Sequence, residues 1–156
     1  VEVSIFRYFV TTASCMPRQI EVTKPVVYGD VPYPEEWVPG DKLAYLVVTD
    51  KNWMTYYSTP PKGSDFDTCI YVVVSLGVRP NPGYRIRISQ IRQEKEAIRI
   101  IIELMEPEPG KAYPQVIVRP IAVAEVPKGN LQPYKLLGFV FCDQKGQLIA
   151  TVKTEL

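Results

Sequence analysis

Short apolar runs separated by turn residues constrain the fold of this chain more than any other feature. The runs are rich in β-branched and aromatic residues, and they alternate apolar with polar positions or are continuously apolar, as strands do. The 15 prolines among 156 residues lie between the runs rather than in one tract. The pattern predicts one mainly β domain over residues 1–156, an antiparallel β-sandwich or partly open barrel of about nine strands. A closing hairpin is expected at residues 135–154.

One short helix is expected at residues 50–58. Asp50 is a suitable N-cap residue, and the aromatic residues that follow it, including Trp53, suit one or two helical turns. Pro60 and Pro61 then end the helix, because proline disfavours helical backbone in the residue before it. No longer helix is expected, since no apolar stretch of ten or more residues has helical spacing.

Residues 69–88 read as two strands facing each other across a stiff connector. Each proline of that connector fixes φ near −65°, and the flanking glycines permit backbone geometries that a side chain would forbid. The segment therefore predicts a β-hairpin whose rigid tip is a recognition surface. The connector contains Gly77, Pro80, Pro82 and Gly83.

The same segment, LGVRPNPGYRIRI, resembles the hairpin of the PrcB C-terminal-like family of small bacterial β domains. Three further strings agree with the family in order: DKNWMTYY, SDFDTCIYVVV and MEPEPGKAYPQVIVRPIAVAEVPK. The resemblance covers roughly residues 42–128, and Pro82 stands where the family has a glycine. The family is named after a subunit of a protease complex. The resemblance implies a protein-interaction module, an accessory or stabilising subunit of an exported protease complex, whose partner is another protein such as a secreted protease. It also implies an extracytoplasmic location.

A simple up-and-down order of strands from residue 69 onward would place alternate connectors at one end of the domain. Those connectors are residues 77–83, 105–114 and 143–146, and two of the three are braced by proline. Loops on a rigid β scaffold carry the binding sites of many small domains, and Tyr and Arg are enriched at interface hot spots. The predicted partner-binding residues are Arg79, Pro80, Asn81, Tyr84, Lys111 and Tyr113.

Composition argues against several other functions. The formal charge of +1 provides no field that would attract nucleic acid or an anionic membrane. The chain contains no histidine, which excludes Ser-His-Asp and Cys-His catalysis and every zinc site that uses histidine. No CxxC spacing and no apolar run long enough for a membrane helix occur. We therefore expect no catalytic residues, no cofactor, no metal, no nucleic-acid partner and no integral membrane segment.

Two other functions fit the residues. A protease inhibitor could present the loop at residues 77–83 to an active site as a substrate mimic, with Arg79 at its centre. A carbohydrate-binding sandwich could instead use exposed aromatic side chains. The aromatic candidates for such a platform are Tyr33, Trp37, Trp53 and Tyr57.

The three cysteines leave alternatives open. Cys69 and Cys142 lie in apolar strand-like runs, which favours buried thiols, while a disulfide between them is the alternative in an oxidising setting. The string TASC ending at Cys15 weakly resembles a lipobox, but Arg7 interrupts the preceding apolar stretch.

Alternation also predicts a basic stripe on one strand pair. Arg85, Arg87 and Arg99 fall on the polar face of their strands and are expected to lie on the same side of the sheet. Such a stripe could bind an anion. The favoured interpretation is a solvated face whose charges are balanced by Glu94, Glu96 and Glu103.

Overall fold

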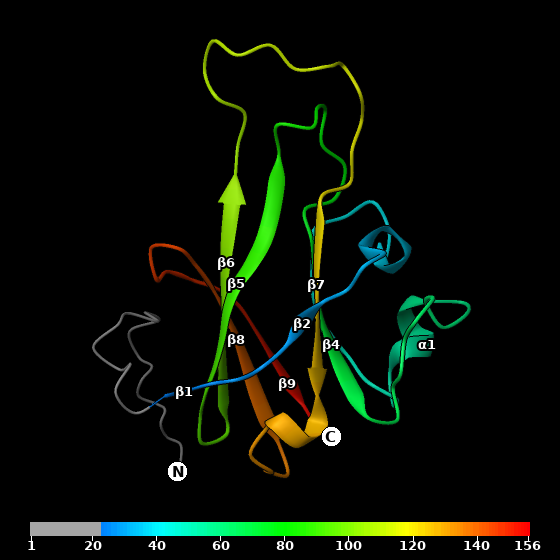
Figure 1. Cartoon of the computed structure of the whole chain (residues 1–156), viewed down its shortest axis with the longest axis vertical. Helices are drawn as coiled ribbons and strands as arrows, with labels where there is room; N and C mark the ends of the chain where they lie inside the picture. Colours follow the sequence, from blue (N-terminus) through cyan, green and yellow to red (C-terminus); the bar gives the residue numbers. More distant parts are fainter. Residues whose placement is uncertain (1–22) are drawn as a thin grey trace.

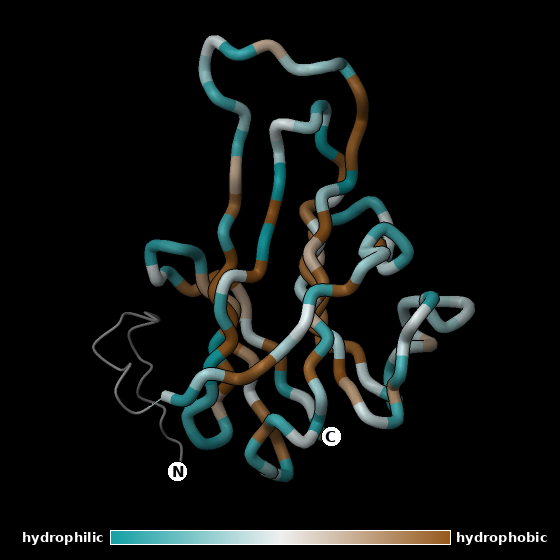
Figure 2. The backbone as a smooth tube through the Cα atoms, in the orientation of Figure 1, coloured by the Kyte–Doolittle hydropathy of each residue, from teal (hydrophilic) through white to brown (hydrophobic). Residues whose placement is uncertain are grey.

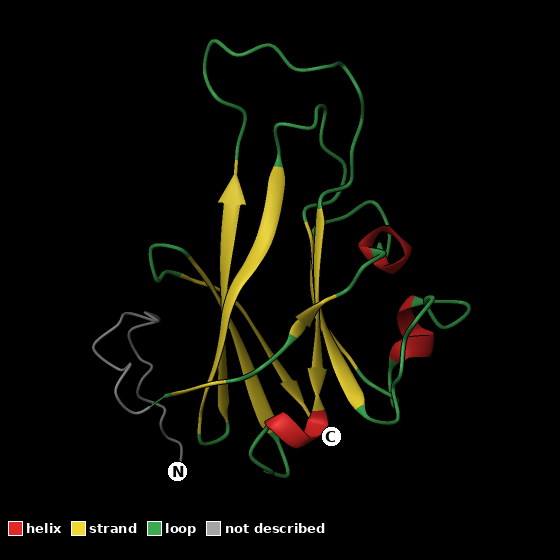
Figure 3. Cartoon of the chain, in the orientation of Figure 1, coloured by secondary structure: helices red, strands yellow, loops and turns green. Residues whose placement is uncertain are grey.

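The computed structural model describes residues 23–156, in which nine strands form two facing sheets and one α-helix lies to the side (Figures 1 and 3). The five-stranded sheet has the order β1(Lys24–Pro25), β5(Arg85–Glu94), β6(Ala97–Met105), β8(Leu137–Asp143) and β9(Leu148–Thr154). The four-stranded sheet has the order β2(Gly29–Asp30), β7(Ile121–Pro127), β4(Cys69–Ser75) and β3(Ala44–Val48). The predicted mainly β, sandwich-like fold is confirmed, and the two sheets do not close into a barrel. The run at the start of the chain and the motif at Cys15 lie outside the described residues.

The predicted up-and-down order is wrong. All strand pairs are antiparallel except β6 with β8, which are parallel from Ala97 opposite Gly138 to Ile102 opposite Asp143. The reason is that β7, which follows β6, belongs to the other sheet and carries the chain back to the opposite end. When β8 then returns to the five-stranded sheet, it runs in the same direction as β6.

The predicted hairpin at residues 69–88 is also wrong. β4 and β5 lie in different sheets, and the connector between them crosses from one sheet to the other. Both edges of β4 are already occupied, by β3 on one side and β7 on the other, so β5 has no edge of β4 to pair with. β5 pairs instead with β6 across a tight turn in which Lys95 adopts a φ of 53°. The predicted closing hairpin is confirmed as β8 and β9.

The main hydrophobic core fills the space between the sheets. The strands alternate as predicted, so that the apolar side of each one faces inward, and hydrophobic segments run along the strands in Figure 2. Burial of this apolar surface is the chief source of stability for a fold of this kind. The core contains Ile70, Val72, Val74, Ile98, Ile100, Ile102, Ala124, Val126, Phe139 and Phe141, among other buried side chains.

A second core covers the outer face of the four-stranded sheet. It centres on Trp37, which lies in the 3₁₀ segment η2(Pro34–Trp37) and is completely buried. The helix α1(Trp53–Tyr56) and the residues after it close this core from the side. β4 is buried along its whole length because it has one core on each face. This buried group of aromatic side chains, which we call the aromatic cluster, consists of Trp37, Tyr57, Phe66 and Tyr71.

The helix is shorter than predicted. α1 spans Trp53–Tyr56, and its N-cap position is Asn52 rather than Asp50. Asn52 is held at that position because its side-chain oxygen accepts a hydrogen bond from the Thr49 N–H (2.7 Å) and its amide donates to the Val47 carbonyl (2.8 Å). A further 3₁₀ segment, η3(Lys128–Asn130), follows β7.

The basic stripe lies where alternation predicted it, on the outward face of β5 and β6. Arg87 forms an ion pair with Glu103 (2.6 Å), and Arg99 forms one with Glu94 (3.1 Å). Both charges are therefore balanced as predicted, but only Arg87 is solvated, because its side chain is 62% exposed and that of Arg99 is 15% exposed. Arg85 lies further along the same face, toward the end of the domain that carries the long loops.

Candidate functional site

Two long loops form one end of the molecule, and we call this end the loop tip. One loop is the β4–β5 connector, residues 76–84, and the other is the β6–β7 connector, residues 106–120 (Figure 1). The sequence predicted that the two proline-braced loops share an end, and the structure confirms it even though the strand order differs. The third predicted loop, the β8–β9 turn, leaves β8 at the same end of the five-stranded sheet, where Gln144 donates to the Leu104 carbonyl near the end of β6 (3.4 Å).

Backbone hydrogen bonds tie the two loops together. Arg79 and Val118 exchange both of their N–H to carbonyl bonds, each 2.9 Å long, so they form a single antiparallel bridge. The Leu76 N–H donates to the Pro120 carbonyl (3.0 Å), just before β7 begins. The pairing of β4 with β7 therefore continues beyond the end of the sheet into the loop tip.

The segment just before β3, which contains Asp41, supports the bridge. The Val78 N–H donates to the Asp41 carbonyl (3.1 Å), and the Arg119 Nε lies 2.7 Å from the Asp41 carboxylate. Gly77 lets this segment approach, because it adopts a φ of +74° and a Cβ there would lie 2.7 Å from the Asp41 carbonyl oxygen. The tip loops are thus held by contacts at several points along their length.

The apex of the first loop is a compact turn built on Asn81. Its side-chain oxygen accepts a hydrogen bond from the Gly83 N–H (2.9 Å), an interaction typical of an Asx turn. Gly83 is required for close packing, since a Cβ there would lie 2.9 Å from the Tyr113 ring and 3.0 Å from the Pro107 Cα. The two loops therefore touch at their apices as well as at the bridge.

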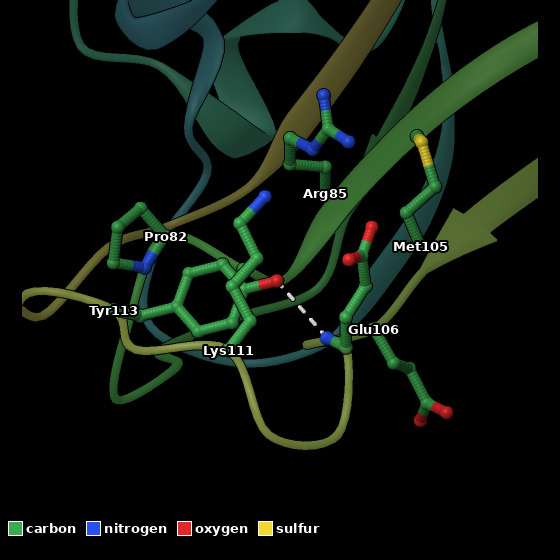
Figure 4. Close-up of a pocket in the computed structure, with 8 residues that line it drawn as sticks. Pro82, Arg85, Met105, Glu106, Lys111 and Tyr113 are labelled. Carbon is green, nitrogen blue, oxygen red and sulfur yellow. Dashed lines mark hydrogen bonds between the residues drawn. The ribbon is translucent and has the colours of Figure 1, made fainter.

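A cavity of about 490 Å³ opens between the loop apices and the end of the β5–β6 pair (Figure 4). The Glu108 N–H donates to the Tyr113 hydroxyl (2.9 Å), and the Lys111 ammonium lies 5.6 Å from the Tyr113 ring centre. The lining carries charges of both signs and a few apolar surfaces. The lining residues are Pro82, Gly83, Arg85, Met105, Glu106, Glu108, Lys111 and Tyr113.

Arg79 and Tyr84 form a separate feature of the loop tip. The Arg79 guanidinium lies 5.4 Å from the Tyr84 ring centre, a cation–π distance. Arg79 also lies close enough to Tyr45 that its charge opposes the rise in the pKa of Tyr45 that burial causes. The Arg79 Nε is buried and has no hydrogen-bond acceptor, and Arg79 forms no ion pair within residues 23–156.

The structure brings the predicted binding residues to one end but divides them into two groups. Lys111 and Tyr113 line the cavity, whereas Arg79 and Tyr84 lie together outside its lining. Asn81 shapes the turn between the two groups. Pro80 is an exposed residue of the same loop.

Sequence reasoning missed several residues of the cavity. Arg85 was assigned to the basic stripe, while Met105 and Glu106 were treated as the end of a strand and the start of a loop. A correct pairing of β5 with β6 would have placed Arg85 opposite Met105 and so revealed this part of the cavity. The incorrect hairpin prediction paired the residues of β5 with β4 instead.

The predicted carbohydrate platform does not exist. Trp37 is completely buried and Tyr57 is 8% exposed, because both pack in the aromatic cluster. Trp53 is partly buried and stacks on Phe66 with ring centres 5.9 Å apart. Of the four residues, only Tyr33 is well exposed, so these side chains do not form a flat aromatic surface for a sugar.

The alternative disulfide between Cys69 and Cys142 is not formed, since Cys69 is a buried free thiol. Within residues 23–156, no group of three or more acidic or cysteine side chains is placed to hold a metal ion. In the same part of the chain, no helix has both the length and the apolar character needed to cross a bilayer.

One segment of the chain, which contains strands and loops just described, matches a known protein family. Residues 70–127 match the PrcB C-terminal family. The matched segment runs from β4 to the end of β7, so it contains both tip loops and all six predicted binding residues, and it confirms the resemblance over this part of the chain. No curated protein matches the chain, and no solved structure matches it either.

Proposed function

We propose that this chain is a non-enzymatic protein-interaction module, an accessory or stabilising subunit of an exported protease complex, and that it binds its partner through the loop tip. The match of residues 70–127 to the PrcB C-terminal family supports an association with a protease complex. That match includes both tip loops, whereas β3, β8 and β9 fall outside it.

The observation that carries the proposal is the unpaired Arg79. A partly buried guanidinium without an acidic neighbour is unfavourable, since burial removes hydration that no protein group replaces. The Arg79 Nε is buried and has no acceptor. A carboxylate of a bound partner would pair with the other nitrogens of this partly exposed guanidinium, with the geometry that makes Arg frequent in interface hot spots.

The bracing of the loops favours binding in a second way. A loop that is already ordered loses less conformational entropy when a partner docks. The Arg79–Val118 bridge, the contact of Val78 with Asp41 and the close packing of Gly83 on Tyr113 order this surface before any partner arrives.

The site offers little for catalysis. The cavity carries two glutamates, one lysine and one arginine, but no serine, threonine or cysteine beside a base. We therefore propose that the chain binds a protein without turning over a substrate.

Inhibition by an Arg79-centred substrate mimic is disfavoured by the geometry. An extended inhibitory loop must offer its backbone groups to the protease and project its central side chain outward. Both backbone groups of Arg79 are already bonded to Val118, and its side chain is partly buried.

The experiment that tests the proposal is capture of a protease from the secreted fraction of the source cells, with the purified chain as bait. Arg79→Ala is compared with Arg87→Ala, which removes an exposed arginine that is paired with Glu103 and lies outside the tip loops. We expect the wild type and Arg87→Ala to retain a protease and Arg79→Ala to retain at least fivefold less, a loss of about 1 kcal/mol. Failure of the wild type to retain any protease, or equal retention by Arg79→Ala, would contradict the proposal.

A further inference from the structure

The β6–β7 connector continues the line of β7 into the loop tip as a strand with one open edge, residues 117–120. Arg79 and Val118 exchange both of their backbone hydrogen bonds, so Val118 directs its N–H and its carbonyl toward the first loop. Successive residues of a strand direct these groups to opposite edges. The backbone groups of Ile117 and Arg119 therefore point away from the first loop.

β2 occupies the same edge further along β7. The Val31 N–H donates to the Val123 carbonyl (3.2 Å), and the pairing of β2 does not extend beyond this bond toward the tip. In the part of the chain that the structure describes, the backbone groups of Ile117 and Arg119 form no hydrogen bond. An open strand edge thus continues the line of β2 into the loop tip.

This edge lacks the features that usually protect an exposed strand, which are lysine, proline and the β-bulge. β9, at the edge of the other sheet, has both an exposed Lys153 and a register shift. Pro120 removes no donor from the open edge, because its carbonyl accepts from the Leu76 N–H (3.0 Å) and its backbone therefore faces the first loop. The donors and acceptors of the open edge are all retained.

The side chains along the edge indicate which strand would pair with it. Ile117 is 66% exposed, and Figure 2 shows a hydrophobic stretch just before β7. The Arg119 Nε lies 2.7 Å from the Asp41 carboxylate, while its other nitrogens have no partner within residues 23–156. Apolar pairs and opposite charges stabilise neighbouring strands, and like charges destabilise them. Antiparallel pairing with a second copy, Ile117 opposite Ile121, would place the two copies of Arg119 side by side, so a foreign strand is favoured.

We propose that the edge at residues 117–121 pairs with an extended segment of a protein partner, in which an acidic residue lies beside Arg119 and apolar residues lie beside Ile117 and Ile121. Unpaired N–H and carbonyl groups at every second residue match the backbone of another strand, and pockets are not required for this mode of recognition. The proposal rests on the function proposed for the loop tip, since it assigns the segment to the same partner. It adds a contact on the edge opposite to Arg79.

The amides of the edge report on the pairing directly. The probe is acetyl-Val-Thr-Glu-Thr-Val-amide, whose order of side chains is the same for parallel and antiparallel pairing. In a ¹H–¹⁵N spectrum, we expect the amide protons of Ile117 and Arg119 to shift downfield and to saturate with a millimolar Kd, the range suited to so short a peptide. The same peptide with an N-methylated glutamate keeps every side chain and loses the central donor, so it is expected to bind at least fivefold more weakly.

Two proline variants locate the pairing. Ile117→Pro removes a donor from the open edge, whereas Val116→Pro changes an amide that alternation directs to the other edge and that has no partner in the described chain. Both positions are exposed, at 66% and 55%. With the Arg119 amide as the reporter, we expect Ile117→Pro to weaken the peptide at least fivefold and Val116→Pro to preserve its affinity.

The outcomes separate this proposal from the function proposed for the loop tip. Edge amides that do not shift up to the solubility limit of the peptide would overturn the pairing, as would equal binding of the N-methylated peptide. Amides of Ile117 and Arg119 that exchange as slowly in the free protein as that of Arg79 would also overturn it, because the edge would already be paired. If Arg79→Ala loses the captured protease while Ile117→Pro and Val116→Pro retain it equally, the edge proposal is wrong and the loop-tip function stands. Peptide binding at the edge without any captured protease would support the edge and contradict the protease partner.

Discussion

The aromatic cluster and the loop tip are both built on β4 and β7, yet they are held together by different forces. The cluster packs Trp37 against Tyr71 with ring centres 4.4 Å apart on the outer face of the sheet, and its side chains are almost fully buried. The loop tip is tied by backbone hydrogen bonds such as the Arg79–Val118 bridge, and most of its side chains remain accessible. The comparison indicates that burial in the cluster stabilises the fold, while the hydrogen bonds of the tip order the surface that we propose to bind a partner.

The largest effect is expected from Trp37→Ala. The substitution removes the central ring of the cluster and leaves a cavity, so the free energy of unfolding should fall by about 3–5 kcal/mol. Denaturant unfolding measures the change. Trp53→Ala is the matched control, because Trp53 is only partly buried and stacks at the edge of the cluster on Phe66. The contrast drawn between the cluster and the tip would be wrong if Trp37→Ala lowered the free energy of unfolding no more than Trp53→Ala does.

A smaller effect is expected from Gly83→Ala in the loop tip. The new Cβ would lie 2.9 Å from the Tyr113 ring and 3.0 Å from the Pro107 Cα, so the two loops must move apart at a cost of about 1–3 kcal/mol. Thermal unfolding of Gly129→Ala is the control, since a Cβ at Gly129 meets nothing within 4 Å. Equal unfolding temperatures for the two variants would show that the loop apices are not packed as described.

The cluster should also determine how stability responds to alkaline pH. Burial is the main cause that raises the pKa of Tyr57 and Tyr71 above the usual value of 10.0, and the hydrogen bond to Glu125 raises that of Tyr71 further. A tyrosine whose pKa is raised by folding contributes stability below pH 10.0 that is lost as the pH rises above it, because only the unfolded chain then ionises. The unfolding free energy of the wild type should therefore fall above pH 10.

Tyr71→Phe tests the origin of that fall. The variant removes one of the two buried tyrosine hydroxyls of the aromatic cluster, so its unfolding free energy should decline less steeply above pH 10 than that of the wild type. Tyr33→Phe is the control, because Tyr33 lies at the surface. If the unfolding free energy of the wild type and of Tyr71→Phe fell equally steeply with pH, the loss of stability at alkaline pH would come from other groups.

The sequence predicted the strands well and their partners poorly. Alternation located the inward isoleucines of β6 and the outward arginines of β5, because both depend only on the period of a strand. The choice of partner depends on which edges are free, and the run at residues 69–75 does not reveal that β4 is flanked on both sides.

The same limit explains what could be predicted of the site. Proline and glycine marked both tip loops, and the binding residues predicted in those loops lie in the segment that matches the family. The separation of Arg79 from the cavity could not be predicted, because it follows from the bridge to Val118, nearly 40 residues away along the chain. The burial of Trp37 was missed for a similar reason, since a proline-rich loop gives no sign that it folds over a sheet.

Hydrogen exchange of the backbone amides in the free protein tests the central claim most directly. The account predicts that the amides of Arg79 and Val118 exchange much more slowly than that of Ala112, an exposed residue of the same loop pair for which the described structure provides no backbone acceptor. At least a hundredfold protection at the bridge, about 2.7 kcal/mol, would establish a surface that is ordered before binding. Exchange of Arg79 and Val118 at the rate of Ala112 would contradict it, because the loops would then be separate and unbraced.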